Sequence, residues 1–269
     1  LKPYTYILGG NSIVNVLIML LMNMEKNIQP SAVEQESRKM LINLFENCPI
    51  PKDQILENLE VFMRPQRFYE VLSLFSLYQK IIDIPGAVME FGVRWGRHIS
   101  MFNAFRGYLE PYNFYRKIVG FDTFEGFLEP SEEDGSSSRV FKGAMAVSDN
   151  YEKYLESVLE LHEKETPLSH IKKCELYKGN APEQLSQYLS ENPETIVALA
   201  YFDMDVYKPT KECLDILKPY LTRGSIIAFD ELLHPQFPGE TKALKDCFDL
   251  AEIKLQKLPN SPYPTFFVL

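Results

Sequence analysis

Apolar positions along the chain follow two different patterns, and the pattern changes near residue 83. Before it, apolar residues recur every three or four positions in the segments 32–46 and 68–82, which is the spacing of one helix face. After the helix-breaking sequence Asp83-Ile84-Pro85-Gly86, short apolar runs alternate with helical segments. The change predicts an N-terminal helical extension over 1–82 and a main domain over 83–269.

The alternation after residue 83 is typical of a mostly parallel sheet with helices on both faces. Strands are expected over 87–91, 118–121, 174–178, 196–202 and 225–229, with a final antiparallel pair over 253–258 and 265–269. The helices between them are expected over 100–109, 150–162, 182–190, 209–220 and 240–248. The prediction is a Rossmann-like α/β fold in which helices flank a seven-stranded, mostly parallel sheet.

The segment 129–148 interrupts this alternation. It begins Glu-Pro-Ser-Glu-Glu-Asp-Gly-Ser-Ser-Ser, a composition that buries little apolar surface. We therefore expect a mobile loop, which serves either as a lid over a ligand or as a plain solvated insertion.

Composition narrows the class of protein. The chain has 269 residues, 45% of them hydrophobic, so it can bury a full core. Its net charge of −9 and pI near 5.1 argue against nucleic acid as the main partner and favour an uncharged or cationic substrate. The four cysteines lack metal-site or redox spacing and are expected to be reduced: Cys48, Cys174, Cys213 and Cys247.

An apolar segment over 13–22 is about half the length needed to cross a bilayer, so no transmembrane segment is expected. We expect it to pack on the main domain or on a second subunit, with membrane-surface contact as the alternative. A homo-oligomer in the cytoplasm is the resulting expectation.

The turn after the first strand carries the clearest chemical signal. Here the sequence Val-Met-Glu-Phe-Gly-Val-Arg-Trp-Gly (88–96) places Glu90, Gly92 and Gly96 at a strand-to-helix turn, and Asp122 ends the next strand. Acids and glycines at these positions are typical of adenosine-containing cofactors. The glycine spacing departs from the G-x-G-x-x-G turn that holds a pyrophosphate, which favours a cofactor without phosphates. S-adenosylmethionine fits, with its amino-acid end near the first turn and its ribose on Asp122.

Acidic residues follow two later strands. Asp203 and Asp205 follow one strand, and Asp230 and Glu231 follow the next, so these carboxylates should meet beside the cofactor. Their mutual repulsion favours a bound Mg²⁺, which prefers oxygen ligands. Such a metal would lower the pKa of a substrate hydroxyl. An acid at a strand end is often only a helix cap or a loop residue, so this structural role stays open as the alternative to metal binding for each of these acids.

Two roles are assigned to individual residues in this cluster. Asp203 is the first choice for metal ligand and proton acceptor, with Asp230 and Glu231 as the other ligands. His234 follows closely and is a candidate base or substrate contact, or an uncommitted loop histidine. His98, after the cofactor turn, is expected to cap or pack rather than to catalyse.

These motifs resemble the macrocin O-methyltransferase family, sugar O-methyltransferases that depend on S-adenosylmethionine and Mg²⁺ and have the class I methyltransferase fold. The matching segments are 85–93, 120–127, 178–180, 202–207, 229–231 and 239–243, in the same order and spacing over roughly residues 60–250. The aspartate followed by Thr-Phe-Glu-Gly-Phe at 122–127 is the most specific of them.

The resemblance implies roles for site residues. Glu90, Phe91 and Gly92 would lie on the methionine side of the cofactor, and Asp122 would hold the ribose. Thr123 and Asn180 would lie near the ribose or adenine. The metal positions would be taken by Asp203, Asp230 and Glu231. Two departures are the Gly-Arg-His sequence at 96–98, where small residues are usual, and Asp230-Glu231 in place of paired aspartates.

The function expected from sequence is methyl transfer to a sugar hydroxyl of a natural product, glycolipid or polysaccharide. A hydroxylase-like activity and a non-catalytic cofactor-binding protein are the alternatives.

Overall fold

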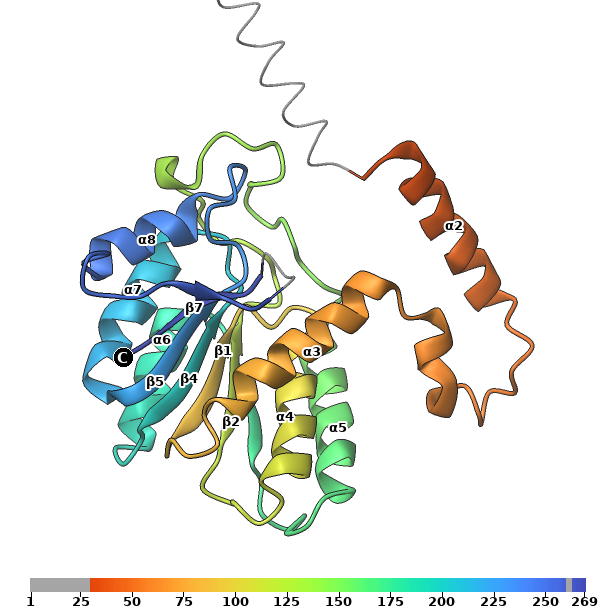
Figure 1. The fold of residues 1–269 in the computed structure, drawn as a ribbon, viewed down its shortest axis with the longest axis horizontal. Coiled ribbons are helices and arrows are strands. Elements are labelled where there is room, and N and C mark those ends of the chain that lie inside the picture. The colour runs from red at the N-terminus through yellow and green to blue at the C-terminus, as the bar shows by residue number, and fades with distance from the viewer. Residues whose placement is uncertain (1–29, 260–262) are drawn as a thin grey trace, which may run out of the picture. The chain divides into compact units, whose positions relative to one another are not determined.

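The computed structural model describes residues 30–259 and 263–269, so the apolar segment 13–22 lies outside the described residues. The chain divides into two compact units, Leu1–Arg64 and Pro65–Leu269 (Figure 1). The sequence placed the boundary near residue 82 instead. The difference arises because helix α3 (Pro65–Gln79) packs on helix α4 (Arg97–Leu109), with the rings of Phe75 and Phe105 5.3 Å apart.

The described part of the first unit contains helix α2 (Ala32–Glu46), with the predicted bounds, and the 3-10 helix η1 (Leu56–Phe62). Helix α2 begins with a capping box, in which Ser31 and Glu34 each accept a hydrogen bond from the other's backbone N–H. The rings of Phe45 and Phe62 pack edge to face at 5.0 Å. Neither helix contains a buried residue.

The second unit contains a seven-stranded sheet of order β3-β2-β1-β4-β5-β7-β6. Its strands are β1 (Ala87–Phe91), β2 (Ile118–Asp122), β3 (Cys174–Lys178), β4 (Val197–Phe202), β5 (Leu221–Phe229), β6 (Gln256–Lys257) and β7 (Thr265–Val268). Strands β1 to β5 are parallel, and β7 runs antiparallel to both neighbours. The predicted seven-stranded, mostly parallel sheet is confirmed.

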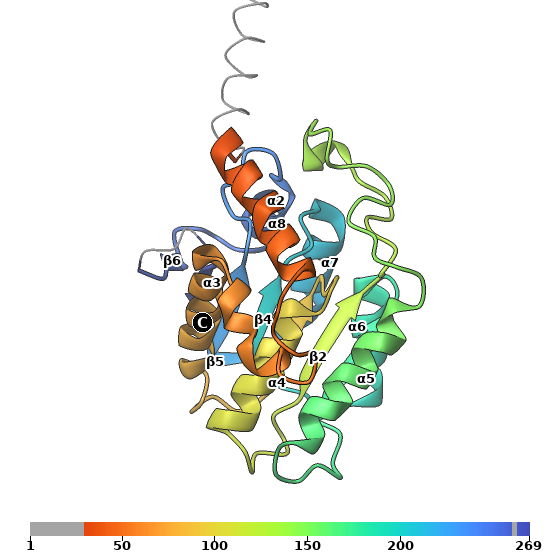
Figure 2. The ribbon, with the colours of Figure 1, turned by 90° about the vertical axis from the view of Figure 1, so that its right-hand side faces the viewer.

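Helices cover both faces of this sheet (Figures 1 and 2). Helices α3, α4 and α5 (Tyr151–Lys164) lie on one face. Helices α6 (Ala181–Glu191), α7 (Tyr207–Leu217) and α8 (Gly239–Cys247) lie on the other. Two short 3-10 helices complete the unit, η2 (Glu132–Asp134) and η3 (Lys218–Tyr220).

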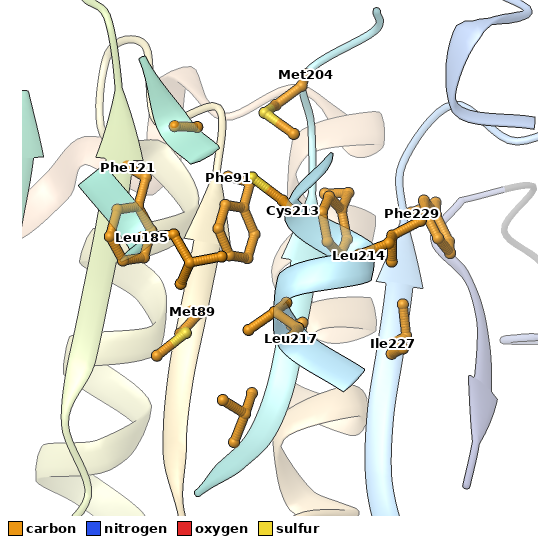
Figure 3. Packing of buried hydrophobic residues seen from close by; sticks show 14 of the residues in the cluster. Met89, Phe91, Phe121, Leu185, Met204, Cys213, Leu214, Leu217, Ile227 and Phe229 are labelled. Atoms are coloured by element: carbon orange, nitrogen blue, oxygen red, sulfur yellow. The ribbon is translucent and has the colours of Figure 1, made fainter. Parts of the chain in front are cut away.

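The core follows the alternation of side chains along each strand. In β1, Met89 and Phe91 face helices α6 to α8 (Figure 3), whereas Val88 faces helices α3 to α5. The ring of Phe91 stacks between those of Phe121 and Phe202, at centroid distances of 5.1 and 4.7 Å. Burial of each such ring contributes roughly 1.5–3 kcal/mol. This packing fixes the ends of the three central strands relative to one another.

The segment between β2 and α5, within which a mobile loop was expected over 129–148, is anchored to the main domain. It includes η2, whose Asp134 is only 1% exposed, and Phe127 and Ala144 from the segment pack on Val206, which follows β4. Oδ1 of Asp134 accepts a hydrogen bond from the backbone N–H of Tyr207 at 2.5 Å. Figures 1 and 2 show the segment in yellow-green, extending from β2 toward α7 and α8 before it returns to α5. The polar composition of the segment did not predict these contacts, because each contact depends on one residue within the segment.

All four cysteines are free thiols, as expected. Within residues 30–259 and 263–269, no helix is long and apolar enough to cross a membrane.

Candidate active site

A cavity of about 1330 Å³ opens at the carboxyl ends of the central strands. The strand order reverses between β1 and β4, the position at which parallel sheets bind ligands. This volume exceeds the roughly 300–1,000 Å³ of ordinary ligand pockets, so the cavity has room for a cofactor and a second molecule. The predicted site residues that line it are Gly92, Asp122, Thr123, Asn180, Asp203, Asp230 and Glu231.

At Gly92, directly after β1, the backbone lies very close to that of Asp203, directly after β4. Its φ is +94°, and a Cβ atom there would lie 1.9 Å from the carbonyl oxygen of Asp203. The N–H of Asp203 donates to the carbonyl of Phe91 at 2.8 Å, and the N–H of Gly92 donates to that of Phe121 at 2.9 Å. Only glycine combines this conformation with this contact. The glycine therefore holds Asp203 at the edge of the cavity.

Asp122 holds together the turn that follows β1 and the turn that follows β2. Its carboxylate accepts hydrogen bonds from the N–H groups of Arg94 at 2.7 Å and Phe124 at 2.5 Å. Both donors have left-handed backbone, with φ of 50° and 57°. Burial raises the pKa of Asp122, and these hydrogen bonds oppose the increase. Next to it, the Thr123 hydroxyl donates to the carbonyl of Gly126 at 2.8 Å and closes the turn.

On the wall of the cavity, His98 lies among three carboxylates. Its Nε2 is 2.8 Å from Oε1 of Glu70, and its Nδ1 is 3.3 Å from both Oε1 of Glu90 and Oδ2 of Asp203. Glu90 is only 1% exposed, and neither of its oxygens has a hydrogen-bond partner in the described part of the chain. The imidazole therefore connects helix α3, strand β1 and the end of strand β4.

The charges of this group depend on one another. Burial alone would lower the pKa of His98, but its contacts with Glu70 and Glu90 and the charge of Asp203 raise it to about 9. Burial raises the pKa of Glu90 to about 7, although His98 opposes the increase. For Glu70, the hydrogen bonds from His98 and Arg67 outweigh burial and lower the pKa to about 2. His98 is thus an imidazolium at neutral pH, paired with the ionised Glu70.

More carboxyl groups gather beyond Asp203. Burial, together with the charge of Asp203, raises the pKa of Glu231 to about 7 and that of Asp230 well above its usual value. Glu240 is fully buried, and its Oε1 accepts the N–H groups of Met204 at 3.0 Å and Asp205 at 3.3 Å. The other oxygen of Glu240 has no hydrogen-bond partner among the described residues. Glu240 thus holds the loop that follows β4.

The donor chemistry of these acids fits the predicted Mg²⁺. Buried oxygens of Asp230 (Oδ1) and Glu231 (Oε2) lack hydrogen-bond partners among the described residues, and carboxylate oxygens are what Mg²⁺ prefers. However, no group of three or more His, Cys, Asp or Glu side chains in the described ranges is arranged to hold a metal ion.

Four other predicted site residues do not line the cavity: Glu90, Phe91, Gly96 and His234. Phe91 places its ring in the core, and Gly96 has a φ of +79° at the start of α4, where a Cβ atom would meet Leu155. Nδ1 of His234 accepts the N–H of Gln236 at 3.2 Å and lies 3.5 Å from Oε2 of Glu231. Burial lowers the pKa of His234.

Sequence reasoning missed the roles of His98, Glu70 and Glu240. A signal for His98 was present, because His98, Phe102 and Arg106 recur at a spacing of four and are all buried. A histidine on the buried face of a helix beside a strand-end acid is a candidate partner for that acid. Glu70 and Glu240 carry no comparable local pattern.

Together, the strand order, the cavity at its reversal and the acids at the ends of β2 and β4 are the arrangement of the class I S-adenosylmethionine-dependent methyltransferase fold. No protein-family model matches the chain, and no curated protein is significantly similar to it.

Among solved structures, the chain is 42% identical to CalS11, a calicheamicin methyltransferase, with a TM-score of 0.87. That alignment covers 90% of this chain and 94% of CalS11. The apo structure of CalS11, a TDP-rhamnose 3′-O-methyltransferase of calicheamicin biosynthesis, matches at 40% identity over 90% of this chain and 96% of that one, with a TM-score of 0.79. The O-methyltransferase NovP, at 17% identity, a TM-score of 0.54 and coverage of 74% and 78%, shows the shared fold.

The chain belongs to the same family as CalS11, the macrocin-type O-methyltransferases that the sequence motifs predicted, and is an S-adenosylmethionine-dependent O-methyltransferase.

Proposed function

We propose that this enzyme methylates a hydroxyl group of a sugar in natural-product biosynthesis. CalS11, whose apo structure is 40% identical to this chain, is a TDP-rhamnose 3′-O-methyltransferase. The observation that carries the proposal is the position of Asp203, which lines the cavity directly after β4 and at the strand-order reversal. A base at this point can act on an acceptor beside the cofactor.

In this proposal Asp203 accepts the proton of the acceptor hydroxyl. The acceptor oxygen forms the new carbon–oxygen bond while the carbon–sulfur bond breaks and its electron pair stays on sulfur. Burial raises the pKa of Asp203, and His98 opposes the increase and favours the ionised form. A carboxylate with a raised pKa is a stronger base than an exposed one. His234 lies outside the cavity lining, so we give it no part in the proton transfer.

We assign the cofactor to the part of the cavity around the turns that follow β1 and β2. Gly92 belongs to its methionine side, Asp122 to its ribose, and Thr123 and Asn180 to its ribose or adenine. Glu90, Phe91 and Gly96 do not line the cavity, so we assign them to the support of these turns rather than to cofactor contact. The positions of Gly92, Asp122, Thr123 and Asn180 in the cavity lining support this assignment.

We further propose Mg²⁺ as a second cofactor, with Asp203, Asp230 and Glu231 as ligands. Oδ1 of Asp230 and Oε2 of Glu231, which accept no hydrogen bond from the described residues, support it. When bound, Mg²⁺ would lower the pKa of a coordinated hydroxyl.

A homo-oligomer and a cytoplasmic location stay predictions. Apolar side chains exposed on the first unit support self-association, among them Val33 (75% exposed), Met40, Ile42, Leu44, Leu56 and Val61. Light scattering of the purified chain tests the oligomer.

Calorimetric titration with S-adenosylmethionine, followed by mass spectrometry of sugar acceptors that include TDP-rhamnose, tests the function. The wild-type chain should bind the cofactor and produce a methylated sugar. Asp203→Asn should retain cofactor binding and lose roughly a hundredfold or more in turnover. A matched control, Asp249→Asn on the exposed surface, should behave like the wild type. Undiminished turnover in Asp203→Asn would contradict the assigned role.

A further inference from the structure

The aromatic side chains that line the cavity differ in how much of their surface they expose. Some are buried in the core, such as Phe121 and Tyr201. Three that line the cavity expose more than a third of their surface: Tyr69 (36%), Trp95 (46%) and Tyr263 (37%). Exposed aromatic rings are typical contact surfaces of ligand sites. Trp95 and Tyr263 both stand next to strands, so the sheet itself locates them.

Trp95 stands on the cofactor side of the cavity. It belongs to the turn that follows β1, to which we assign the methionine side of the cofactor. Its ring packs edge to face on that of Tyr151 at 4.8 Å, and the Tyr151 hydroxyl donates to the Trp95 carbonyl at 3.0 Å. These contacts hold the indole at the cofactor turn, so we do not assign Trp95 to the acceptor.

Tyr263 stands on the other side of Asp203. Strand β7 runs antiparallel to β5, and its first residue, Thr265, lies opposite Phe229, the last residue of β5. Because Tyr263 precedes β7 by two positions, it lies at the same edge of the sheet as the acids that follow β5. In the strand order β2-β1-β4-β5-β7, the end of β4 lies between the cofactor turns and Tyr263. Asp203 follows β4, so a molecule bound at Tyr263 meets Asp203 from the side opposite the cofactor.

The surroundings of Tyr263 agree with this position. Burial raises the pKa of its phenol, and the charges of Glu231 and Asp230 add to the increase. Since the interaction between charges weakens with distance, the phenol lies near these two acids. Both acids line the same cavity as Tyr263 and Asp203. The ring and the carboxylates therefore border one space, next to the proposed proton acceptor.

We propose that the ring of Tyr263 stacks against the sugar ring of the acceptor and binds it beside Asp203. The proposal rests on the proposed sugar methylation and names a residue that binds the acceptor. The face of an aromatic ring carries partial negative charge, which attracts the C–H groups of a sugar ring. A tyrosine ring also loses little conformational entropy on binding, because only two torsion angles fix it.

A stacking contact of this kind has a kinetic signature. It is made both in the bound acceptor and in the transition state, so its loss raises KM for the acceptor more than it lowers kcat. Loss of the proton acceptor Asp203 has the opposite signature, because the reactants stay bound while kcat falls. The ring makes the proposed contact, so Tyr263→Phe should retain it and Tyr263→Leu should lose it.

The test is calorimetry on the full chain saturated with S-adenosylhomocysteine, with TDP-rhamnose and TDP as probes, followed by KM and kcat with TDP-rhamnose. The proteins are the wild type, Tyr263→Phe, Tyr263→Leu and the control Tyr112→Leu. Tyr112 is 73% exposed in the connection between α4 and β2 and does not line the cavity. Thermal unfolding and the binding of S-adenosylhomocysteine, measured first, should be alike in all of them and show that each variant is folded.

TDP-rhamnose should bind the wild type, Tyr263→Phe and Tyr112→Leu alike, and Tyr263→Leu about tenfold or more weakly. TDP lacks the sugar and should not distinguish the proteins. Unchanged affinity of Tyr263→Leu for TDP-rhamnose, an equal loss for TDP, or no binding of TDP-rhamnose to the wild type would overturn the proposal. Failure of the proposed function looks different: TDP-rhamnose would bind through Tyr263 with the expected pattern, but the wild type would produce no methylated sugar.

Discussion

Nδ1 of His98, near the start of α4, lies 3.3 Å from Oδ2 of Asp203, the residue that follows β4. The same imidazole binds Glu70 through its other nitrogen. A positive charge is therefore fixed beneath the proposed proton acceptor. It opposes the burial-driven increase in the pKa of Asp203, favours the ionised form, and leaves the cavity side of the residue open to an acceptor.

The contacts of His98 predict a pH-dependent contribution to stability. Its pKa is raised from 6.5 to about 9 in the folded protein. A raised pKa means that the contribution is fully present below pH 6.5 and is lost as the pH rises through about 9. His98→Gln should remove a contribution on the order of 1–3 kcal/mol at neutral pH.

Urea unfolding of wild type and His98→Gln between pH 6 and 10 measures this effect. The wild type should lose more free energy of unfolding over this range than the variant. His170→Gln, an exposed histidine, is the control and should follow the wild type. Parallel pH profiles for wild type and His98→Gln would show that His98 is not charged in the folded state.

Alanine substitutions at two glycines with similar φ angles separate the cost of backbone strain from the cost of a steric clash. Gly92 and Gly143 have φ values of +94° and +83°, but a Cβ atom at Gly143 would meet nothing within 4 Å. Gly143→Ala should therefore cost only about 1–2 kcal/mol, for the left-handed backbone. Gly92→Ala adds the collision with the Asp203 carbonyl, so it should cost several kcal/mol more and weaken cofactor binding. Denaturant unfolding and calorimetry measure both, and equal costs would contradict the close approach of β1 and β4.

Glu240 is expected to act as a hydrogen-bond acceptor rather than as a charge. Burial, followed by the charge of Asp205, raises its pKa well above the usual value. Glu240→Gln keeps an acceptor for the N–H groups of Met204 and Asp205 and should cost little. Glu240→Ala leaves these donors unpaired and should cost about 2–4 kcal/mol. Thermal unfolding of both variants at pH 7 gives the comparison, and similar losses would show that the charge matters.

Asp134 is expected to control access to the segment with Arg139 and Lys142. Asp134→Ala removes the acceptor for the N–H groups of Ser131 and Tyr207, so the segment should open more often. Trypsin should then cleave after Arg139 or Lys142 several times faster than in the wild type. Glu133→Ala, at the exposed neighbouring position, should leave the cleavage rate unchanged. An unchanged rate in Asp134→Ala would mean that other contacts anchor the segment.

Much of the fold followed from local sequence. The predicted bounds of α2, β1 and β3 match the structure, because apolar spacing and the break at Pro85-Gly86 are local signals. Strand β6 is shorter than expected, with two residues where 253–258 was predicted. No strand of the described residues pairs with its outer edge, so pairing with β7 alone sets its length.

The site was predictable to the extent that its acids follow strands. Asp122, Asp203, Asp230 and Glu231 line one cavity because the carboxyl ends of parallel strands meet at one edge. The partners of these acids were not predictable in the same way. Glu70 reaches His98 from a helix that begins before the first strand, and Glu240 reaches Met204 across 36 positions, so only tertiary packing brings them together.

The central claim is that Asp203 accepts the proton of a sugar hydroxyl during methyl transfer. Its most direct test is the single-turnover rate with saturating S-adenosylmethionine and the sugar acceptor that the product assay identifies, measured for the wild type and Asp203→Asn. The account predicts that the variant binds both reactants and transfers the methyl group roughly a hundredfold or more slowly. A single-turnover rate equal to that of the wild type would contradict the assignment of Asp203 as the proton acceptor.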